Sequence, residues 1–353
     1  MVLQSLEKGE SRARIAARET PPVLLWAAAG MCMVAFEVYV WMRWLTGSNL
    51  RPTDPGSDPI SDWERAYYIG LQIAVPVLWA LCMWFWVIKP WMRERRMTSD
   101  GMIAIACWAI CIFDCIMNYT SLTLLYNSQF VNFGAWTTGS FPGWTQPNGN
   151  HLPEPIFVTI PGYVALVYSQ VVFVCMLLRR AKARWPGMGI LGAIGFVVLG
   201  LTLVDSIIEI FLIRSGVYAY PGGIREVTLF AGETYQFPLT EGFLFGGLAF
   251  GSVAVLKHFK DDKGSTFVER GVDQLRVGER SRTGLRFFAI FAYVHLMFLA
   301  LYGVPNQWLA THSDPFPAGY PSYLTNGMCV YGDTRDQCPG PGVSIPRPEN
   351  NPF

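Results

Sequence analysis

Charged residues are scarce in this chain of 353 residues. Asp, Glu, Lys and Arg make up 15% of the sequence, whereas soluble domains usually carry about 25%. Hydrophobic residues make up 52%, and the mean hydropathy is +0.28. This composition excludes an ordinary soluble domain and predicts an integral membrane protein. The net charge is only +1, but the basic residues are distributed very unevenly along the chain.

Residues needed for several common membrane chemistries are also missing. None of the six Lys lies within an apolar run, which excludes a retinal Schiff base. The four His are scattered and too few for a membrane di-iron site. There is no Gly-rich phosphate loop, and paired Asp-rich motifs are absent, which argues against nucleotide and magnesium–diphosphate chemistry. We therefore expect no metal and no cofactor.

Seven apolar runs are long enough to cross a bilayer as helices, which takes about 17–25 residues. They are Pro21–Thr46, Tyr67–Ile88, Gly101–Leu125, Ile156–Leu178, Gly189–Arg214, Phe237–Leu256 and Leu285–Tyr302. The predicted fold is an all-α integral membrane protein, a seven-transmembrane-helix bundle over residues 21–302. We expect a cytoplasmic arm at 1–20 before it, and an irregular external tail at 303–353, rich in Pro and Gly, after it.

Basic residues alternate from loop to loop. The N-terminal arm and the segments after the second, fourth and sixth spans hold 20 of the 27 Lys and Arg, whereas the loop over 126–155 holds none. The positive-inside rule then places the N-terminus inside and the C-terminus outside, in a multi-pass protein of the cell membrane. The basic segment after the sixth span favours contact with anionic lipid rather than nucleic acid. Nothing in the sequence indicates the oligomeric state.

Two of the eight cysteines fall in the external tail. Cys329 and Cys338 are nine residues apart there, and an extracytoplasmic location permits a disulfide between them. The alternative is two free thiols. The other six cysteines lie in apolar runs, where we expect them to behave as small apolar residues.

Acidic residues stand inside or at the edge of these runs, although an acid at mid-membrane costs about 2.5–3.5 kcal/mol. In the predicted topology they all lie between the membrane centre and its outer face. Asp205 and Glu209 are one helical turn apart on one face, and two acids so close in a low dielectric do not both ionise easily. One can act as general acid and the other as base. The candidate catalytic residues are Glu37, Asp114, Asp205, Glu209, Glu241 and His295.

Each of these residues also has a structural interpretation. Glu37 could pair with Arg43, Glu241 could cap the sixth span, and His295 could be a buried core histidine. A purely structural role is least expected for the Asp205–Glu209 pair.

Polar and aromatic residues at a similar depth, or in the outer loops above them, are candidates for binding a substrate. They are Asn118, Trp136, Tyr218, Tyr235, Tyr302 and Asn306. The outer loops are largely aromatic, which favours an uncharged, lipophilic small molecule as the partner, in addition to the lipid bilayer.

Four segments carry a resemblance to a known family. They read Tyr-Ala-Tyr-Pro-Gly at 218–222, Tyr-Gln-Phe-Pro-Leu-Thr-Glu at 235–241, Asp-Asp-Lys-Gly at 261–264 and Thr-Phe-Val-Glu-Arg-Gly at 266–271. In this order they resemble the AveC-type spirocyclases, membrane proteins of actinobacterial secondary metabolism. The resemblance implies spiroketal formation on a polyketide, with dehydration in some members. It assigns no catalytic residue here.

The resemblance and the acidic residues point to the same chemistry. Spiroketal formation joins two hydroxyls to a ketone with loss of water, and it needs an acid and a base but neither metal nor nucleotide. We therefore expect a metal-free cyclase acting on a lipophilic dihydroxy ketone. Two alternatives remain open: an isoprenoid cyclase or isomerase that protonates its substrate with a buried acid, and a non-catalytic lipid-binding protein or proton-coupled carrier.

Overall fold

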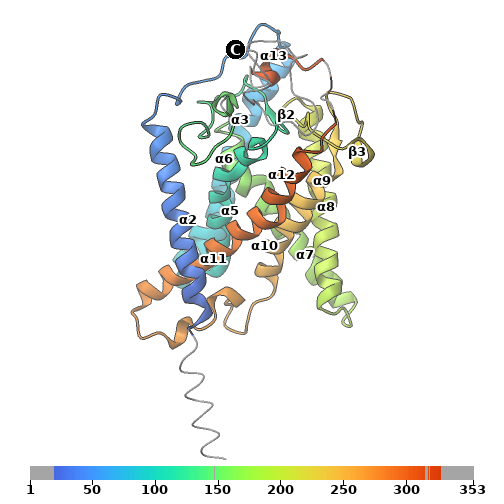
Figure 1. The fold of residues 1–353 in the computed structure, drawn as a ribbon. Helices are drawn as coiled ribbons and strands as arrows, with labels where there is room; N and C mark the ends of the chain where they lie inside the picture. Colours follow the sequence, from blue (N-terminus) through green and yellow to red (C-terminus); the bar gives the residue numbers. More distant parts are fainter. Residues whose placement is uncertain (1–19, 147, 315–316, 318, 327–353) are drawn as a thin grey trace, which may run out of the picture.

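Seven long helices form a bundle (Figure 1). The computed structural model of the protein describes residues 20–146, 148–314, 317 and 319–326. Among these residues, seven helices are long and apolar enough to cross a membrane. They are α2 (Pro22–Leu45), α3–η1–α4 (Asp62–Met83, Trp84–Ile88, Lys89–Glu94), α5–η2 (Ser99–Ala109, Ile110–Asn118), α6–η4–α7 (Thr159–Gly162, Tyr163–Tyr168, Ser169–Arg184), α8 (Ile190–Arg214), α9–η6–α10 (Leu239–Glu241, Gly242–Phe250, Gly251–His258) and α11–η9–α12 (Glu279–Phe298, Leu299–Gly303, Val304–Ala310).

The structure confirms the predicted fold class, a helical bundle with seven membrane-length helices. The direction in which they would cross a bilayer stays a prediction, as does the division into an arm, a membrane domain and a tail. The N-terminal arm and the Cys329–Cys338 pair lie outside the described residues, apart from Thr20.

Several helix ends differ from the predicted ends, and three of the differences bear on the outer end of the bundle. The second helix begins at Asp62 rather than Tyr67, because Ser61 and Glu64 form a capping box that starts it earlier. The third ends at Asn118, whose side chain accepts hydrogen bonds from the backbone N–H groups of Thr123 and Leu124. The seventh continues to Ala310, so the expectation of irregular chain from residue 303 is wrong at its start.

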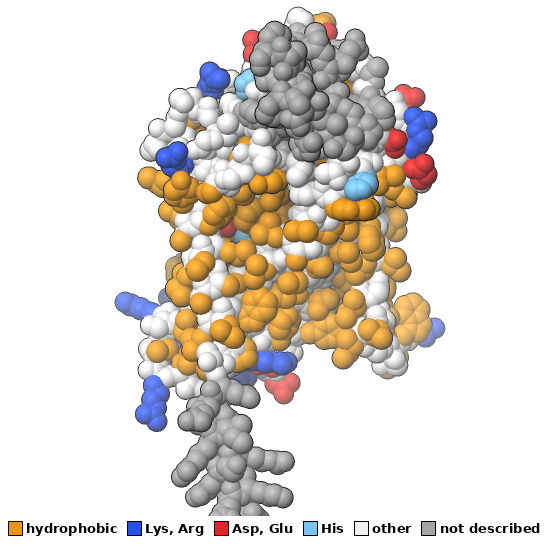
Figure 2. Space-filling view, in the orientation of Figure 1, with side chains coloured by type: hydrophobic (Ala, Val, Ile, Leu, Met, Phe, Trp, Pro, Cys, Tyr) orange, Lys and Arg blue, Asp and Glu red, His pale blue; other side chains and the backbone are white. Residues whose placement is uncertain are grey.

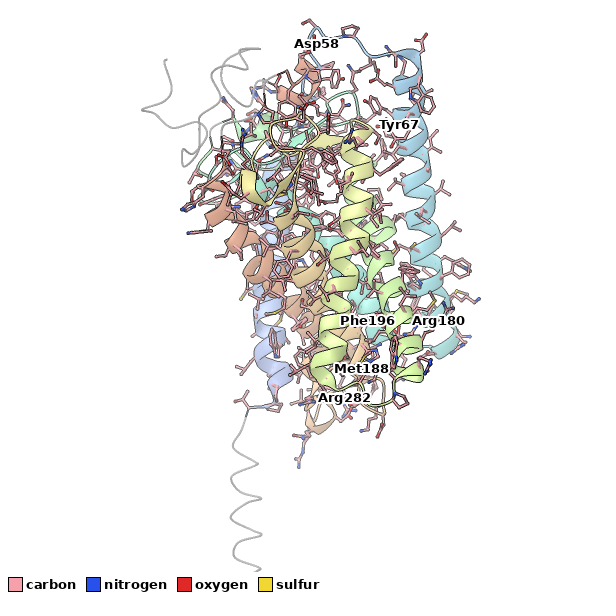
Figure 3. The ribbon with its side chains drawn as sticks, turned by 90° about the vertical axis from the view of Figure 1, so that its right-hand side faces the viewer. Asp58, Tyr67, Arg180, Met188, Phe196 and Arg282 are labelled. Carbon is pink, nitrogen blue, oxygen red and sulfur yellow. The ribbon has the colours of Figure 1, made fainter. Side chains whose placement is uncertain are left out.

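The two ends of the bundle differ in charge. Figure 3 shows Arg180 and Arg282 at one end, which we call the inner end, and Asp58 and Tyr67 at the opposite, outer end. Between them Figure 2 shows a broad apolar surface with almost no charged side chains. On α8, for example, Leu199 and Leu203 are 70% and 63% exposed. Such a surface is compatible with a membrane protein.

The outer end is closed by loops and short elements. Strand β1 (Leu125–Tyr126) pairs antiparallel with β2 (Tyr218–Ala219), with Tyr126 opposite Tyr218. Strands β3 (Thr228–Leu229) and β4 (Phe237–Pro238) form a second pair. Figure 1 shows β2 and the short helix α13 (Ser322–Thr325) together at this end. The remaining short helices are η3 (Gly149–His151), η5 (Arg225–Val227), η7 (Phe267–Glu269) and η8 (Val272–Gln274).

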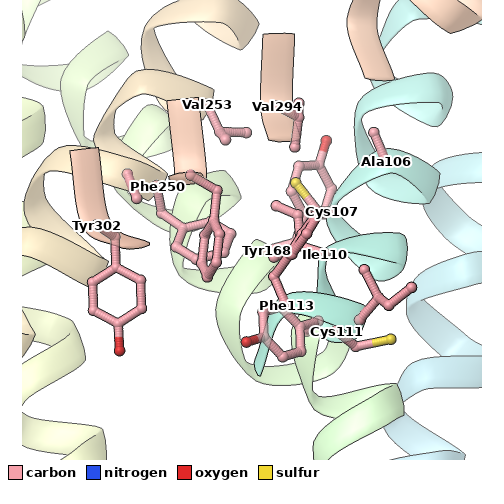
Figure 4. Close-up of a cluster of buried hydrophobic side chains, with 14 of the residues drawn as sticks. Ala106, Cys107, Ile110, Cys111, Phe113, Tyr168, Phe250, Val253, Val294 and Tyr302 are labelled. Carbon is pink, nitrogen blue, oxygen red and sulfur yellow. The ribbon is translucent and has the colours of Figure 1, made fainter. Parts of the chain in front are cut away.

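The core between the helices is apolar and aromatic. Figure 4 shows side chains from several helices meeting there, including Cys107, Cys111 and Phe250. The cysteines that the structure describes are free, and all but Cys32 are buried. They fill space as small apolar residues, as expected from the sequence.

The inner-end segment that carries part of the family resemblance is built around Glu269. Its buried carboxylate accepts hydrogen bonds from Arg286 Nε at 2.6 Å, from the Ser99 hydroxyl at 3.0 Å and from the Thr266 backbone N–H at 2.6 Å. These bonds tie the segment to the starts of α5 and α11. We therefore assign this motif to folding rather than to chemistry.

Candidate active site

A cavity lies in the outer half of the bundle, surrounded by η2, the α6–η4–α7 helix, α8 and the β1–β2 strands. Its empty space is about 690 Å³, including the part that is open to the outside. Three acids that the sequence singled out, Asp114, Asp205 and Glu209, line this one cavity. They come from two separate helices, so the convergence that the catalytic hypothesis requires is present. Their catalytic role stays a prediction.

Helix α8 presents Asp205 and Glu209 one turn apart. Both are buried, and each has one partnered oxygen. Gln170 Nε2 donates to Asp205 Oδ1 at 3.2 Å, and the Tyr220 hydroxyl donates to Glu209 Oε1 at 3.0 Å. The second oxygens, Asp205 Oδ2 and Glu209 Oε2, have no hydrogen-bond partner among the described residues. Such unsatisfied buried oxygens are costly unless a bound molecule provides a partner for them.

Close packing between α8 and η6 sets the position of Asp205. A Cβ added to Gly246 would lie 2.6 Å from the Asp205 Cβ and 2.8 Å from its Oδ2. Small residues at every fourth position allow helices to approach in this way. The segment holds two such pairs in succession, Gly242 with Gly246 and Gly247 with Gly251. Sequence analysis missed this signal, which a search for such spacings would have found.

Asp114 is held by two phenols. The Tyr126 and Tyr163 hydroxyls donate to its Oδ2 and Oδ1, each at 2.6 Å. Burial and the neighbouring Asp114 charge raise the pKa of Tyr126 well above its usual value of 10.0, so this phenol keeps its proton and remains a donor. Each oxygen of Asp114 therefore accepts one hydrogen bond from a phenol.

Glu154, in the loop before α6, is a second acid beside Asp114 that was not among the predicted site residues. Its side chain is fully buried. Burial, followed by the Asp114 charge, raises the pKa of the Glu154 carboxyl well above its usual value of 4.5. The surroundings of Glu154 therefore favour the protonated form of its carboxyl. It lies in a neutral aromatic loop rather than an apolar helix, so the search for acids within spans could not identify it.

Glu241 lies close to the cavity without lining it. Its Oε2 accepts a hydrogen bond from the Tyr302 hydroxyl at 2.9 Å, and Tyr302 lines the cavity. Its effect on a bound molecule would therefore act through Tyr302.

Glu37 and His295 do not line the cavity. They face each other between α2 and α11, with Glu37 Oε1 2.9 Å from His295 Nε2. The other ring nitrogen, Nδ1, donates to the Phe291 carbonyl at 2.8 Å, and the ring stacks on Phe291. This geometry favours a role in helix–helix contact, and the catalytic role of these two residues stays a prediction. The alternative Glu37–Arg43 pairing is also absent, because Arg43 bonds to the Gly139 carbonyl.

The six predicted substrate-binding residues separate into two groups. Tyr218 and Tyr302 line the cavity, whereas the other four do not. Asn118 bonds to the backbone of the next loop, as described above. Trp136 donates from its indole nitrogen to the Ile112 carbonyl at 2.6 Å, and Arg214 lies 3.8 Å from the Tyr235 ring centre. Asn306 is buried, and its Nδ2 has no partner among the described residues.

No three His, Cys, Asp or Glu side chains in the described residues are grouped so that they could hold a metal ion.

Comparison with known proteins gives one match. Residues 94–325 match the family model described as "Spirocyclase AveC-like". The matched segment is more than half of the chain and includes every acid that lines the cavity, as well as Glu154, but it begins after Glu37. No curated protein and no solved structure matches the chain.

Proposed function

This chain belongs to the AveC-like spirocyclase family, and we propose that it is a multi-pass protein of the cell membrane that forms a spiroketal from a lipophilic, polyketide-like dihydroxy ketone. The family suggests a cyclase. The observation that carries the more specific proposal is the meeting of Asp114, Asp205 and Glu209 at one buried cavity. Intramembrane acids that share a cavity are expected at functional sites, since their burial is costly.

The reaction needs two proton transfers of opposite direction in each ring closure. In the first closure, one substrate hydroxyl adds to the ketone carbon, a base takes its proton and an acid protonates the carbonyl oxygen, giving a hemiketal. In the second, an acid protonates the hemiketal hydroxyl, and the carbon–oxygen bond breaks to release water. The second hydroxyl then attacks the resulting oxocarbenium ion and loses its proton to a base. One water leaves, and the protein is regenerated.

Asp205 and Glu209 are the residues best suited to these transfers. Each has one free buried oxygen, Oδ2 and Oε2 respectively, and their separation by one helical turn lets a single substrate reach both. In low dielectric the two carboxyls favour sharing one negative charge. The neutral member would then act as acid and the ionised member as base, and the negative charge would stabilise the oxocarbenium ion.

The tyrosines around the cavity would orient the substrate. Tyr126 and Tyr163 connect Asp114 to the cavity, and Tyr220 contacts Glu209. A cavity walled by such rigid phenols can hold one conformation of a flexible chain and so select one product stereoisomer.

Reconstituted protein and a synthetic substrate test this proposal. The substrate is a long-chain dihydroxy ketone with hydroxyls placed to close two cyclic ethers. The proposal predicts faster loss of one water than in protein-free bilayers, and a single spiroketal stereoisomer by chiral chromatography with mass spectrometry. Cyclisation at the protein-free rate, with the uncatalysed isomer mixture, would refute it.

A further inference from the structure

We propose that the substrate enters the cavity sideways from the bilayer, through an opening between α8 and η4 that we call the side window. Its edges are Leu166 and Val167 on η4 and Ile208 and Leu212 on α8. The identity of the ligand in this inference rests on the proposed function, whereas the route does not.

The outer end of the cavity is closed by two layers. The first is the β1–β2 pair, whose Tyr126 and Tyr218 side chains are both buried. The second is the segment around α13, where Asn326 Nδ2 donates to the Tyr126 carbonyl at 2.8 Å. In addition, the Ser128 hydroxyl donates to the Tyr323 carbonyl at 3.0 Å. A long molecule coming from this side would have to displace both layers.

The side of the cavity is less completely covered. The four window residues are partly exposed, in contrast to the buried acids behind them. They have apolar side chains. On α8, their neighbours Ile207 and Phe211 are 60% and 62% exposed. These residues belong to the broad apolar surface of the bundle, so the window opens toward the region where lipid chains would lie.

Contacts between helices frame the window above and below. On the inner side, the Gln170–Asp205 hydrogen bond joins α7 to α8, and a Cβ added to Gly200 would lie 3.2 Å from Val174. On the outer side, the Tyr67 hydroxyl donates to the Ser215 hydroxyl at 2.9 Å and ties α3 to the end of α8. Helix α8 is thus fastened to a neighbouring helix at both levels, to α7 on the inner side and to α3 on the outer side, and the level between them carries the window.

This route defines the class of substrate. A molecule arriving through the hydrocarbon layer must be uncharged, because moving a charged group there without a partner is strongly unfavourable. A neutral alkyl-rich hydroxy ketone meets this condition, whereas an anionic or carrier-bound acyl chain does not. The preceding step must therefore release its product as a neutral, lipid-soluble molecule.

A photoreactive probe tests the route without requiring turnover. The probe is a long-chain diol bearing a diazirine, added to the full-length protein in lipid nanodiscs, with the labelled residues mapped by mass spectrometry. In the unmodified protein we expect labels on Met117 and Phe245, which line the interior. Leu212→Trp and Ile208→Trp, which narrow the window, should each reduce this interior labelling several-fold. Leu203→Trp is the matched control on the same helix, since Leu203 faces outward at 63% exposure, and should leave it unchanged.

Two results would overturn the side window. One is interior labelling that neither narrowing variant reduces, with both variants folded as judged by gel filtration. The other is interior labelling by a short, water-soluble diazirine but not by the lipid probe, which would place the entrance at the aqueous end. Because labelling needs no chemistry, correct labelling with no spiroketal product would reject the proposed reaction and leave the window standing.

Discussion

Asp205 packs directly on the backbone of Gly246: a Cβ at position 246 would lie 2.6 Å from the Asp205 Cβ. Real Cβ atoms do not approach other atoms so closely, so either the side chain or the helix would have to move. The absence of a side chain at residue 246 therefore determines where one of the cavity acids sits.

Gly246→Ala should consequently displace Asp205 from the cavity wall. We expect a stability loss of about 1–3 kcal/mol from overpacking and a larger fractional loss of cyclisation rate. Gly195→Ala is the matched control, since Gly195 lies on the same helix as Asp205 and a Cβ there would meet nothing within 4 Å. Thermal unfolding and turnover of purified protein measure the two effects. Equal activity in the two variants would show that the contact does not position the acid.

Tyr163→Phe should weaken catalysis more than stability. It removes one of the two hydrogen bonds to Asp114, and a hydrogen bond to a charged group contributes about 1.5–3 kcal/mol. Tyr293→Phe is the control, because the Tyr293 hydroxyl bonds at 3.3 Å to the Ser252 carbonyl away from the cavity. The turnover number and the unfolding midpoint should be measured for both. A loss of turnover no greater than in the control would remove Tyr163 from the active site.

Glu154 should make stability depend on pH. Its pKa in the folded protein is raised above the usual 4.5 by burial and by Asp114, so above pH 4.5 the folded state binds a proton that the unfolded state releases. The contribution of Glu154 to the free energy of unfolding is then fully present below pH 4.5. It is lost as the pH rises through the pKa of Glu154 in the folded protein, by at most about 1.4 kcal/mol per pH unit.

Glu154→Gln should therefore flatten the loss of stability toward alkaline pH. Unfolding midpoints at about pH 5 and about pH 8 provide the comparison. The exposed Glu226→Gln is the control and should retain the full dependence of the unmodified protein. If the unfolding midpoint of Glu154→Gln depends on pH as strongly as that of the unmodified protein, another group causes the dependence.

The Glu37–His295 contact should matter for stability rather than for turnover. Removing one partner of a buried pair costs about 3–5 kcal/mol, because the other group is left unpaired. Glu37→Leu and His295→Leu should each destabilise, and the double variant should lose less than the sum of the two. Turnover per folded molecule should be retained. A folded variant that has lost turnover would instead support the predicted catalytic role of these residues.

Apolar run length was enough to predict the seven helices, because crossing a bilayer imposes a length and a composition that few other structures share. The i, i+4 spacing also placed Asp205 and Glu209 together on one face. Neither signal could reveal which helices are neighbours, and so Glu37 and His295 were grouped with the cavity acids by depth alone. Depth gives only the position of a residue along the bundle, whereas residues share a site only if their helices are also neighbours and their side chains point toward one another.

Site residues in loops were harder to predict than site residues in helices. Glu154 and Tyr126 reach the site from chain segments without helical or strand periodicity, so their direction cannot be read from spacing. Conversely, Trp136 and Tyr235 were chosen as aromatic residues of outer loops, and the structure places them in local packing. The aromatic content of the outer loops favoured a lipophilic ligand but did not indicate which rings would face it.

Turnover by Asp205→Asn and Glu209→Gln tests the central claim most directly. Both changes keep the side chain's size while removing its ability to exchange a proton, and the reconstituted variants should bind the diol probe as the unmodified protein does. We predict that each lowers spiroketal formation by at least about a hundredfold, within the usual range for acid–base residues. Full turnover in both folded variants would contradict the claim that these two carboxyls carry the chemistry.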